Sequence, residues 1–331
     1  MASGSAPRRS ARVLQWAQEH GEVGGVHASH RQLTQALRAQ GYAVDYVDTG
    51  AAARAARSVP SWWGRRTLHL FHITRLWRAV VLAPVFAVLP GRSAVVLHSG
   101  STLRQVQRLG RPGGAVLRLA LHAYDEIWAV NDEIRQVLPD SLRDRVRVVT
   151  PFVPTPTDPA VVAPRRDPHA VCVATNAGLA HYRAELAVEA VGLVRAAEWP
   201  DATLRVLAYG HDGEQLGRLR AAVAPLEWVT LTFDAPAEEV RAVLASSAVF
   251  LRPTDWDGDS VIVREALDAG ARVVASDTAP RPLGVELAPL EPVALAAAVT
   301  RGGRPSDGAG LAADTLLVAA DAALSALETS G

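Results

Sequence analysis

Four carboxylates fall within eleven residues of the chain. Asp255, Asp257 and Asp259 lie in a loop after an apolar run, and Glu265 follows eight residues after Asp257. Ionised carboxylates accept hydrogen bonds from vicinal hydroxyls, so Glu265 could hold a ribose and Asp257 an adjacent sugar ring. Three acids could also bind Mg²⁺, but aspartates in such a loop more often cap a helix and face solvent. We therefore expect no metal site here.

A helix that begins near Ser260 would add a phosphate site to this loop. Asp259 and Ser260 are both good N-cap residues. The backbone N–H groups of Ser260, Val261 and Ile262 then have no partner within the helix, and with the helix dipole they attract an anion. Gly258 allows the backbone to approach such a ligand closely. A plain capped helix that follows a strand, with no ligand, is the structural alternative.

The stretch 257–276 resembles the donor site of glycosyltransferase family 4, whose members are retaining enzymes with two facing Rossmann-like domains. The family phrase E-G-x-G-x-x-x-x-E-A-x-x-x-G-x-P-V-V-A-S reads here D-G-D-S-V-I-V-R-E-A-L-D-A-G-A-R-V-V-A-S. Glu265 matches the second glutamate, whereas Asp257 replaces the first, Ser260 the second glycine and Arg272 the proline. The resemblance implies a nucleoside diphosphate sugar as donor substrate, with no cofactor and no essential metal.

Parts of the front half resemble the same family. Gly24 and Gly25 match the G-G-x-x-x-H opening, where a glycine loop lies against the donor phosphate or the acceptor. His98 follows an apolar run, at the place where the family's histidine contacts the transferred sugar; His72 is a weaker candidate one strand earlier. A tight loop and a structural histidine are the alternatives. We expect His27 and His30 at a helix surface and Asn131 as a helix cap.

The cations that grip the diphosphate are only partly kept. The family motif G-R-L-x-x-x-K-G aligns with residues 177–184, which places Arg183 at the lysine and Gly178 at the arginine. The resemblance thus implies catalytic roles for His98, Asp257 and Arg183, and it leaves one cation missing. Arg252 or Arg281 could substitute for that cation, a point that the sequence leaves open.

Charge is segregated along a chain whose net charge is zero. All 34 basic residues are arginine; residues 1–167 hold 22 of them against 12 acids, a net +10, and residues 168–331 hold the reverse, a net −10. No acid lies between Asp48 and Asp125, where Trp77 and apolar residues accompany 11 arginines. This favours an acidic or lipid-linked acceptor and peripheral contact with an anionic membrane. A core helix flanked by solvated arginines is the alternative, and nothing indicates nucleic acid.

Composition is that of a globular protein. The 331 residues are 49% hydrophobic and 21% charged, and the single cysteine, Cys172, in an apolar run, excludes a disulfide framework. The longest apolar run, 79–90, contains prolines and is too short to span a bilayer. We expect a cytoplasmic protein, with the inner membrane face as one option, in a bacterial setting inferred only from the resemblance.

Short apolar runs alternate with helix-length segments throughout, which is typical of parallel α/β sheets. A proline-rich stretch, 151–168, interrupts the alternation and indicates a linker. The sequence predicts an α/β fold with two facing Rossmann-like domains (GT-B architecture) and a cleft between them. The expected bounds are a disordered N-terminus over 1–10, an acceptor domain over 11–153, a linker over 154–167, a nucleotide-sugar domain over 168–311, and a helix over 312–331 that could cross back to the first domain.

These patterns together predict a retaining, metal-independent glycosyltransferase. Two other classes stay open. The same scaffold could carry an epimerase or a phosphorylase, because fold does not fix the reaction. The departures at Asp257 and Gly178 are also compatible with a catalytically degenerate protein that binds a nucleotide sugar or a partner enzyme.

Overall fold

The computed structural model describes residues 9–17, 24–50, 62–154, 165–210, 213–302 and 314–329. They form two compact units. The first comprises the described residues of 9–17, 26–50, 62–154 and 314–329, and the second comprises 24–25, 165–210 and 213–302. Residues 1–8 of the expected disordered N-terminus and 155–164 of the expected linker lie outside the described residues.

The first unit is a parallel six-stranded sheet with the strand order β2-β1-β3-β4-β5-β6. Its strands are β1 (Arg12–Ala17), β2 (Ala43–Asp48), β3 (Thr67–Ile73), β4 (Arg92–Leu97), β5 (Glu126–Ala129) and β6 (Val146–Val148). Its helices are α1 (Gly25–Ala39), α3 (Leu76–Phe86), α4 (Thr102–Leu121), α5 (Asp132–Val137), α6 (Asp140–Arg143) and α12 (Leu316–Thr329). β3 is buried along its whole length, as expected for a central parallel strand covered on both faces.

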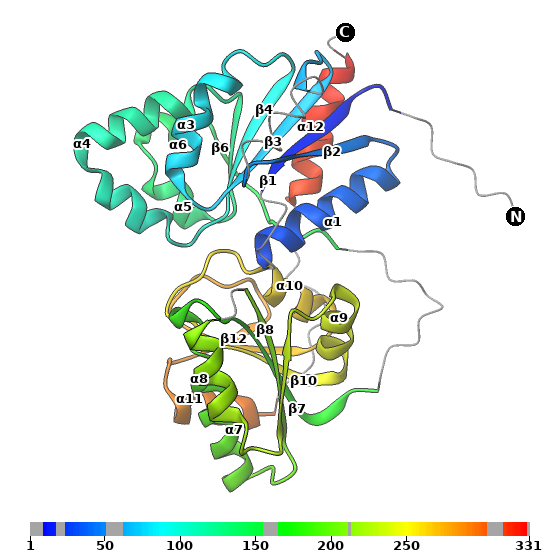
Figure 1. Ribbon diagram of the computed structural model, residues 1–331, viewed down its shortest axis with the longest axis vertical. Helices are drawn as coiled ribbons and strands as arrows, with labels where there is room; N and C mark the ends of the chain where they lie inside the picture. The colour runs from blue at the N-terminus through cyan, green and yellow to red at the C-terminus, as the bar shows by residue number, and fades with distance from the viewer. Residues whose placement is uncertain are drawn as a thin grey trace, which may run out of the picture. The chain divides into compact units, whose positions relative to one another are not determined.

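Helix α12 packs against the sheet of the first unit although the whole second unit separates it in sequence from β6 (Figure 1). The segment before it pairs with residue 150: Thr150 N–H donates to Asp314 O at 2.8 Å, and Leu316 N–H donates to Thr150 O at 2.9 Å. Leu316 and Leu324 are fully buried in the core of this unit. The C-terminal helix is therefore part of the first unit.

The second unit is also a parallel six-stranded sheet, with the order β12-β11-β10-β7-β8-β9. Its strands are β7 (Asp167–Asn176), β8 (Thr203–Tyr209), β9 (Val229–Phe233), β10 (Ser247–Arg252), β11 (Arg272–Ser276) and β12 (Val285–Ala288). Its helices are α7 (Ala184–Ala197), α8 (Glu214–Val223), α9 (Ala237–Ser246), α10 (Val261–Asp268) and α11 (Pro292–Thr300). Cys172, which lies in an apolar run of the sequence, is a fully buried β7 residue, and burial raises the pKa of its thiol to about 12.

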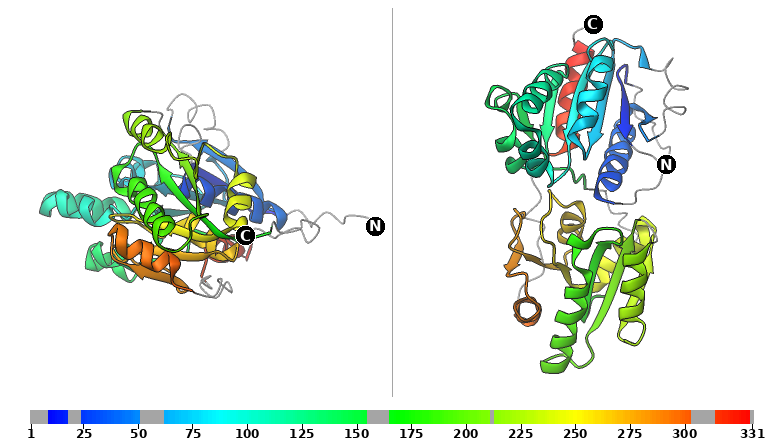
Figure 2. Two further views of the ribbon diagram at one scale, coloured as in Figure 1. Left: turned by 90° about the horizontal axis from the view of Figure 1, so that it is seen from below. Right: turned by 60° about the vertical axis from the view of Figure 1, so that its left-hand side comes forward.

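Helices cover both faces of the second sheet (Figure 2). α7, α8 and α11 contribute to one core, and α9 and α10 contribute to another on the opposite face. The two parallel sheets with flanking helices confirm the predicted α/β class. A short 3-10 turn, η2 (Ala180–Tyr182), precedes α7, and Arg183 between them has a left-handed backbone.

Candidate functional site

The loops that carry most of the predicted site residues meet at one edge of the second sheet. β7 and β10 are neighbouring parallel strands, and the chain moves from β7 toward β8 but from β10 toward β11, in opposite directions across the sheet. The carboxyl ends of such diverging strands form the crevice in which open α/β sheets bind ligands. Here those ends are Asn176 and Arg252.

The amino end of α10 lies at this edge, without a side-chain cap. Ser260 is the N-cap by position, but its side chain makes no capping hydrogen bond, and the Asp259 carboxylate accepts from Arg264 Nε at 2.7 Å instead. Our expectation that one of these side chains would cap the helix was wrong. The first backbone bonds to Ser260 O come from Val263 and Arg264, at 3.1 and 3.3 Å. The N–H groups of 260–262 therefore come before the first hydrogen bonds within the helix, and the Ser260 side chain does not accept a hydrogen bond from any of them.

Each of the three loop aspartates forms an ion pair with arginine. The pairs are Asp255–Arg183 at 2.9 Å, Asp257–Arg252 at 2.9 Å, Asp257–Arg281 at 2.8 Å and Asp259–Arg264 at 2.7 Å. The expectation of solvent-facing caps was thus wrong for Asp257 and Asp259, whose side chains are only 13% and 6% exposed. Within the described residues no cluster of potential metal ligands occurs.

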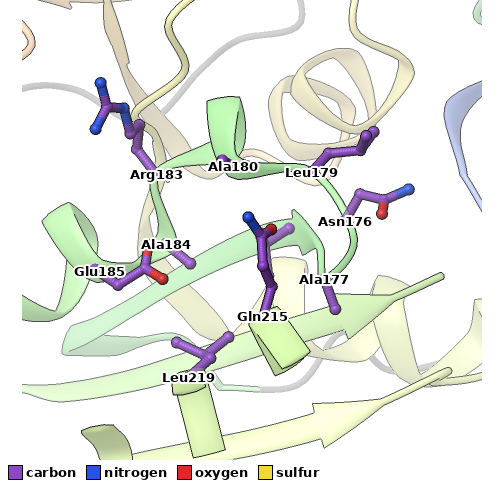
Figure 3. Close-up of a pocket in the computed structure, with 10 residues that line it drawn as sticks. Asn176, Ala177, Leu179, Ala180, Arg183, Ala184, Glu185, Gln215 and Leu219 are labelled. Atoms are coloured by element: carbon purple, nitrogen blue, oxygen red, sulfur yellow. The ribbon is translucent and has the colours of Figure 1, made fainter. Parts of the chain in front are cut away.

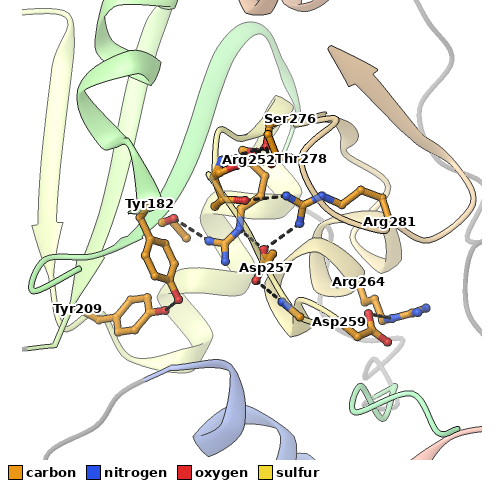
Figure 4. Close-up of polar contacts among 12 residues, drawn as sticks. Tyr182, Tyr209, Arg252, Asp257, Asp259, Arg264, Ser276, Thr278 and Arg281 are labelled. Carbon is orange, nitrogen blue, oxygen red and sulfur yellow. Dashed lines mark hydrogen bonds and ion pairs between the residues drawn. The ribbon is translucent and has the colours of Figure 1, made fainter. Parts of the chain in front are cut away.

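Asp257 lies between two buried guanidinium groups (Figure 4). Arg252 Nε and Arg281 Nη1 both donate to its Oδ2 atom, and Gly258 N–H donates to Oδ1 at 3.0 Å. Burial raises the pKa of the Asp257 carboxyl, but the two arginines outweigh burial and hold it below its ordinary value. Two cations against one anion leave this cluster with a net positive charge.

Both arginines are anchored by further contacts. Arg252 Nη1 donates to Ala174 O at 3.0 Å, and its guanidinium carbon lies 4.6 Å from the centre of the Tyr182 ring. Tyr209 donates its hydroxyl to that of Tyr182 at 3.1 Å. Arg281 Nη2 donates to Thr254 Oγ1 at 2.7 Å, whereas its buried Nε has no partner among the described residues. The loops after β7, β8 and β10 are thereby held together.

Arg183 lines a pocket at the amino ends of α7 and α8 (Figure 3). Its φ of 48° places it in the left-handed region, and half of its side chain is exposed. In Figure 3 the guanidinium points away from Gln215 and Leu219. The loop that carries it is tied to the loop after β10, because Asp255 N–H donates to His181 O at 2.9 Å and the His181 ring stacks on Trp256 at 3.8 Å between centroids.

Glu265 lies on the second turn of α10 and is partly buried, four residues after Val261 begins the helix. Gly258 lies in the loop ahead of that helix, and Val261 is buried. The structure therefore brings Asp257, Gly258 and Glu265 to the same edge as the amino end of α10. The roles that we assigned to them remain predictions.

His98 belongs to a group of histidines in the first unit. It follows β4 directly, and its Nε2 lies 2.9 Å from His72 Nδ1. Burial, aided by the charge of His30, lowers the pKa of His98 to about 3. His30, which we expected at the helix surface, is only 4% exposed, and its Nε2 lies 3.1 Å from Nδ1 of the partly buried His27. That expectation was wrong because one face of α1 packs on the sheet.

Two smaller predictions concern a glycine loop and a helix cap. Gly24 precedes α1 and Gly25 is its first residue. Asn131 caps α5, with Oδ1 accepting from Ile134 N–H at 2.9 Å, as predicted.

Arg252 and Arg281 were considered from the sequence only as substitute cations. An arginine at the end of an apolar strand is itself a signal, because a buried arginine needs a paired acid.

Comparison with known proteins agrees with this architecture. Residues 167–301 match the family described as glycosyl transferases group 1. No curated protein matches the chain. In the described part of the chain, no helix has the length and apolar character needed to span a bilayer.

Solved structures with a similar fold include GT-B glycosyltransferases. HepE of Anabaena, in complex with UDP, is 14% identical with a TM-score of 0.59, over 97% of this chain and 98% of HepE. Sucrose-phosphate synthase of Thermosynechococcus elongatus is 16% identical with a TM-score of 0.59, over 96% and 94%. The pneumococcal O-GlcNAc transferase GtfA, with UDP and GlcNAc, is 14% identical with a TM-score of 0.50, over 68% and 44%. The match thus spans less than half of GtfA but nearly all of the other two.

Proposed function

We propose that the protein transfers a glycosyl group from a nucleoside diphosphate sugar to an acceptor, with retention at the anomeric carbon and without a metal ion. The family match over 167–301 and the GT-B fold support sugar transfer. The observation that carries the proposal is the amino end of α10, which lies at the switch point of the second sheet with no side-chain cap and with Glu265 one turn further on.

In this proposal the N–H groups of 260–262 bind the diphosphate, and Glu265 binds the ribose hydroxyls. Negative charge builds on the diphosphate as the glycosidic bond breaks. Helix N–H groups and Arg183 fixed near that charge stabilise the transition state without reorganisation. His98 and Asp257 contact the transferred sugar. Arg281, whose buried Nε has no partner among the described residues, supplies the cation that Gly178 lacks.

Thermal shifts with UDP, GDP, ADP, TDP and CDP, each alone and as a sugar conjugate, test the donor site. A ligand at about 100 times its Kd should add roughly 2.7 kcal/mol to the free energy of unfolding. We expect one base to be preferred and Glu265→Ala to remove its shift. Asp268→Ala is the matched control, because Asp268 is exposed at the other end of α10. Unchanged donor affinity in Glu265→Ala would exclude the ribose role.

Two observations also favour the second candidate, a nucleotide-sugar-binding protein without turnover. Gly178 replaces a cation, and the Asp257 carboxylate is already occupied by two arginines. Donor hydrolysis, followed by a broad acceptor screen that includes anionic and lipid-linked acceptors, distinguishes the candidates. Transfer to any acceptor supports the enzyme, whereas tight donor binding with neither hydrolysis nor transfer supports the degenerate protein.

A further inference from the structure

Helix α3 has an apolar stripe on its solvent-exposed face. Its core-facing residues are buried in the first unit. On the other face, Trp77, Val81, Pro84 and Val88 are exposed, with Trp77 at 55%, Val81 at 61% and Val88 at 67%. Their spacing of four, three and four residues places them along one line of the helix and the turn that follows it. The face of α3 that packs in the core is thus different from this exposed apolar face.

Helix α4 repeats the pattern beside α3. The two helices pack against each other (Figure 1). α4 changes direction at Gly110, whose φ is 61°, and the segment after the kink exposes Pro112, Val116 and Leu119 at the same four-and-three spacing. Val116 is 52% exposed and Leu119 is 75% exposed. The first unit therefore presents two neighbouring helices that each have an apolar stripe.

Apolar exposure is concentrated on these helices. The described residues include 13 exposed large hydrophobic side chains, and six of them lie on α3, on α4 or in the turn after α3: Trp77, Val81, Val88, Leu109, Val116 and Leu119. A soluble monomer scatters such residues singly, whereas a cluster rimmed by polar groups marks a binding surface.

The polar groups around the stripes are arginines. The segments of α3 and α4 contain Arg75, Arg78, Arg104, Arg108, Arg111 and Arg118, and no acid lies between Asp48 and Asp125. All but Arg78 are exposed, and the Arg78 guanidinium lies 5.7 Å from the centre of the Trp77 ring. The surface thus combines an exposed tryptophan and aliphatic side chains with cations of one sign.

We propose that the exposed faces of α3 and α4, called here the α3–α4 surface, dock on a membrane rich in anionic lipid. Apolar side chains that enter the headgroup region between arginines match the chemistry of an interfacial helix, and tryptophan favours that depth. Anionic headgroups provide the complementary charge that this stretch of the chain lacks. The inference does not rest on the proposed function, since it concerns no residue of the donor site.

Flotation of the full chain with vesicles tests the proposal. Phosphatidylcholine vesicles with phosphatidylglycerol should bind the protein, and vesicles of phosphatidylcholine alone should bind it weakly. Salt should weaken the binding, because surface charge is screened. Trp77→Ser with Val81→Ser should lower binding at least about tenfold, and Arg108→Gln with Arg118→Gln should lower it roughly thirtyfold.

Matched variants come from the second unit. Leu283 and Val293 are 80% and 70% exposed, so Leu283→Ser with Val293→Ser removes comparable apolar surface elsewhere. Arg241→Gln with Arg301→Gln removes two exposed cations in the same unit. These controls should bind like the unmodified chain, and all variants should keep its Tm because the positions are exposed. Absence of binding to the anionic vesicles, equal loss in the controls, or a change only in self-association would overturn the proposal.

Discussion

Arg183 combines an unusual backbone with an exposed cation. Glycine adopts its φ of 48° without a Cβ clash. Arg183→Gly therefore removes the charge while it relieves the backbone, and we expect the free energy of unfolding to change by less than about 1 kcal/mol. Affinity for nucleoside diphosphates should fall about tenfold or more, because a charge-assisted contact is lost. Calorimetric titration and urea unfolding measure the two quantities, and Arg183→Lys should keep most of the affinity.

The buried cluster around Asp257 should behave as one unit. Asp257→Asn leaves Arg252 and Arg281 buried without their counterion, so we expect a loss of about 3–5 kcal/mol in the free energy of unfolding. Arg281→Met should lower the free energy of unfolding by less in the Asp257→Asn protein than in the unmodified one, because the Asp257–Arg281 ion pair is already absent there. Urea unfolding of the four proteins gives the coupling. Additive losses would show that the 2.8 Å contact is energetically unimportant.

The buried histidines predict a one-sided pH dependence. Burial lowers the pKa of His30 and His98 to about 3. The unfolded chain binds these protons near pH 6.5, so stability is full above that pH and falls as the pH drops toward 3. Each group should contribute a slope of about 1.4 kcal/mol per pH unit in this window. The unfolding of His98→Gln, measured at several pH values, should show a shallower slope, and an unchanged slope would exclude His98 as a source.

At this scale the sequence predicted the helix that follows the aspartate loop but not the partners of the aspartates. Ser260 could be placed at the start of α10 and Glu265 on its second turn because both positions follow from local spacing along the chain. Asp257 and Arg281 are 24 positions apart in sequence. They meet because β10 and β11 are parallel neighbours, so that the loops after both strands lie at the same edge of the sheet. No local spacing encodes such a contact. For the same reason the burial of His30 depended on which face of α1 packs, which its neighbours alone did not decide.

At the scale of elements, α12 is the piece whose packing can be tested most directly. Leu316 is fully buried in the first unit, so Leu316→Ala should lower the free energy of unfolding of that unit by about 2–5 kcal/mol. Val318, on the same helix, is 47% exposed, and Val318→Ala should have little effect. Chemical denaturation measures both. Equal effects of the two variants would mean that α12 does not pack as described.

The strands were predictable because parallel strands buried on both faces read as continuous apolar runs, as β11 (Arg272–Ser276) does. The start of α7 was not predictable. The η2 turn and the left-handed Arg183 fit a helix pattern in sequence, and the break lies where the loop after β10 contacts this segment. Elements defined by their own burial could thus be predicted, and elements shaped by a neighbouring loop could not.

At the scale of the whole molecule, two cores predict two unfolding transitions. Each unit has its own hydrophobic clusters, so calorimetry should resolve separate steps, with the first unit assigned by the shift that Leu316→Ala causes. A saturating nucleotide should raise the Tm of the other step, because the donor site proposed here lies in the second unit. A nucleotide that raises the Tm of only the step assigned to the first unit would contradict a donor site in the second unit.

The pairing of residue 150 with residues 314–316 has a consequence for biosynthesis. The second unit is contiguous from β7 to α11, so it can fold as soon as that stretch has emerged from the ribosome. The first unit is translated earlier, yet it cannot bury Leu316 and Leu324 until α12 has been made. The apolar surface of its sheet that α12 covers therefore stays exposed while about half of the chain is still being synthesised. The second unit thus completes its fold before the first, although it is translated later.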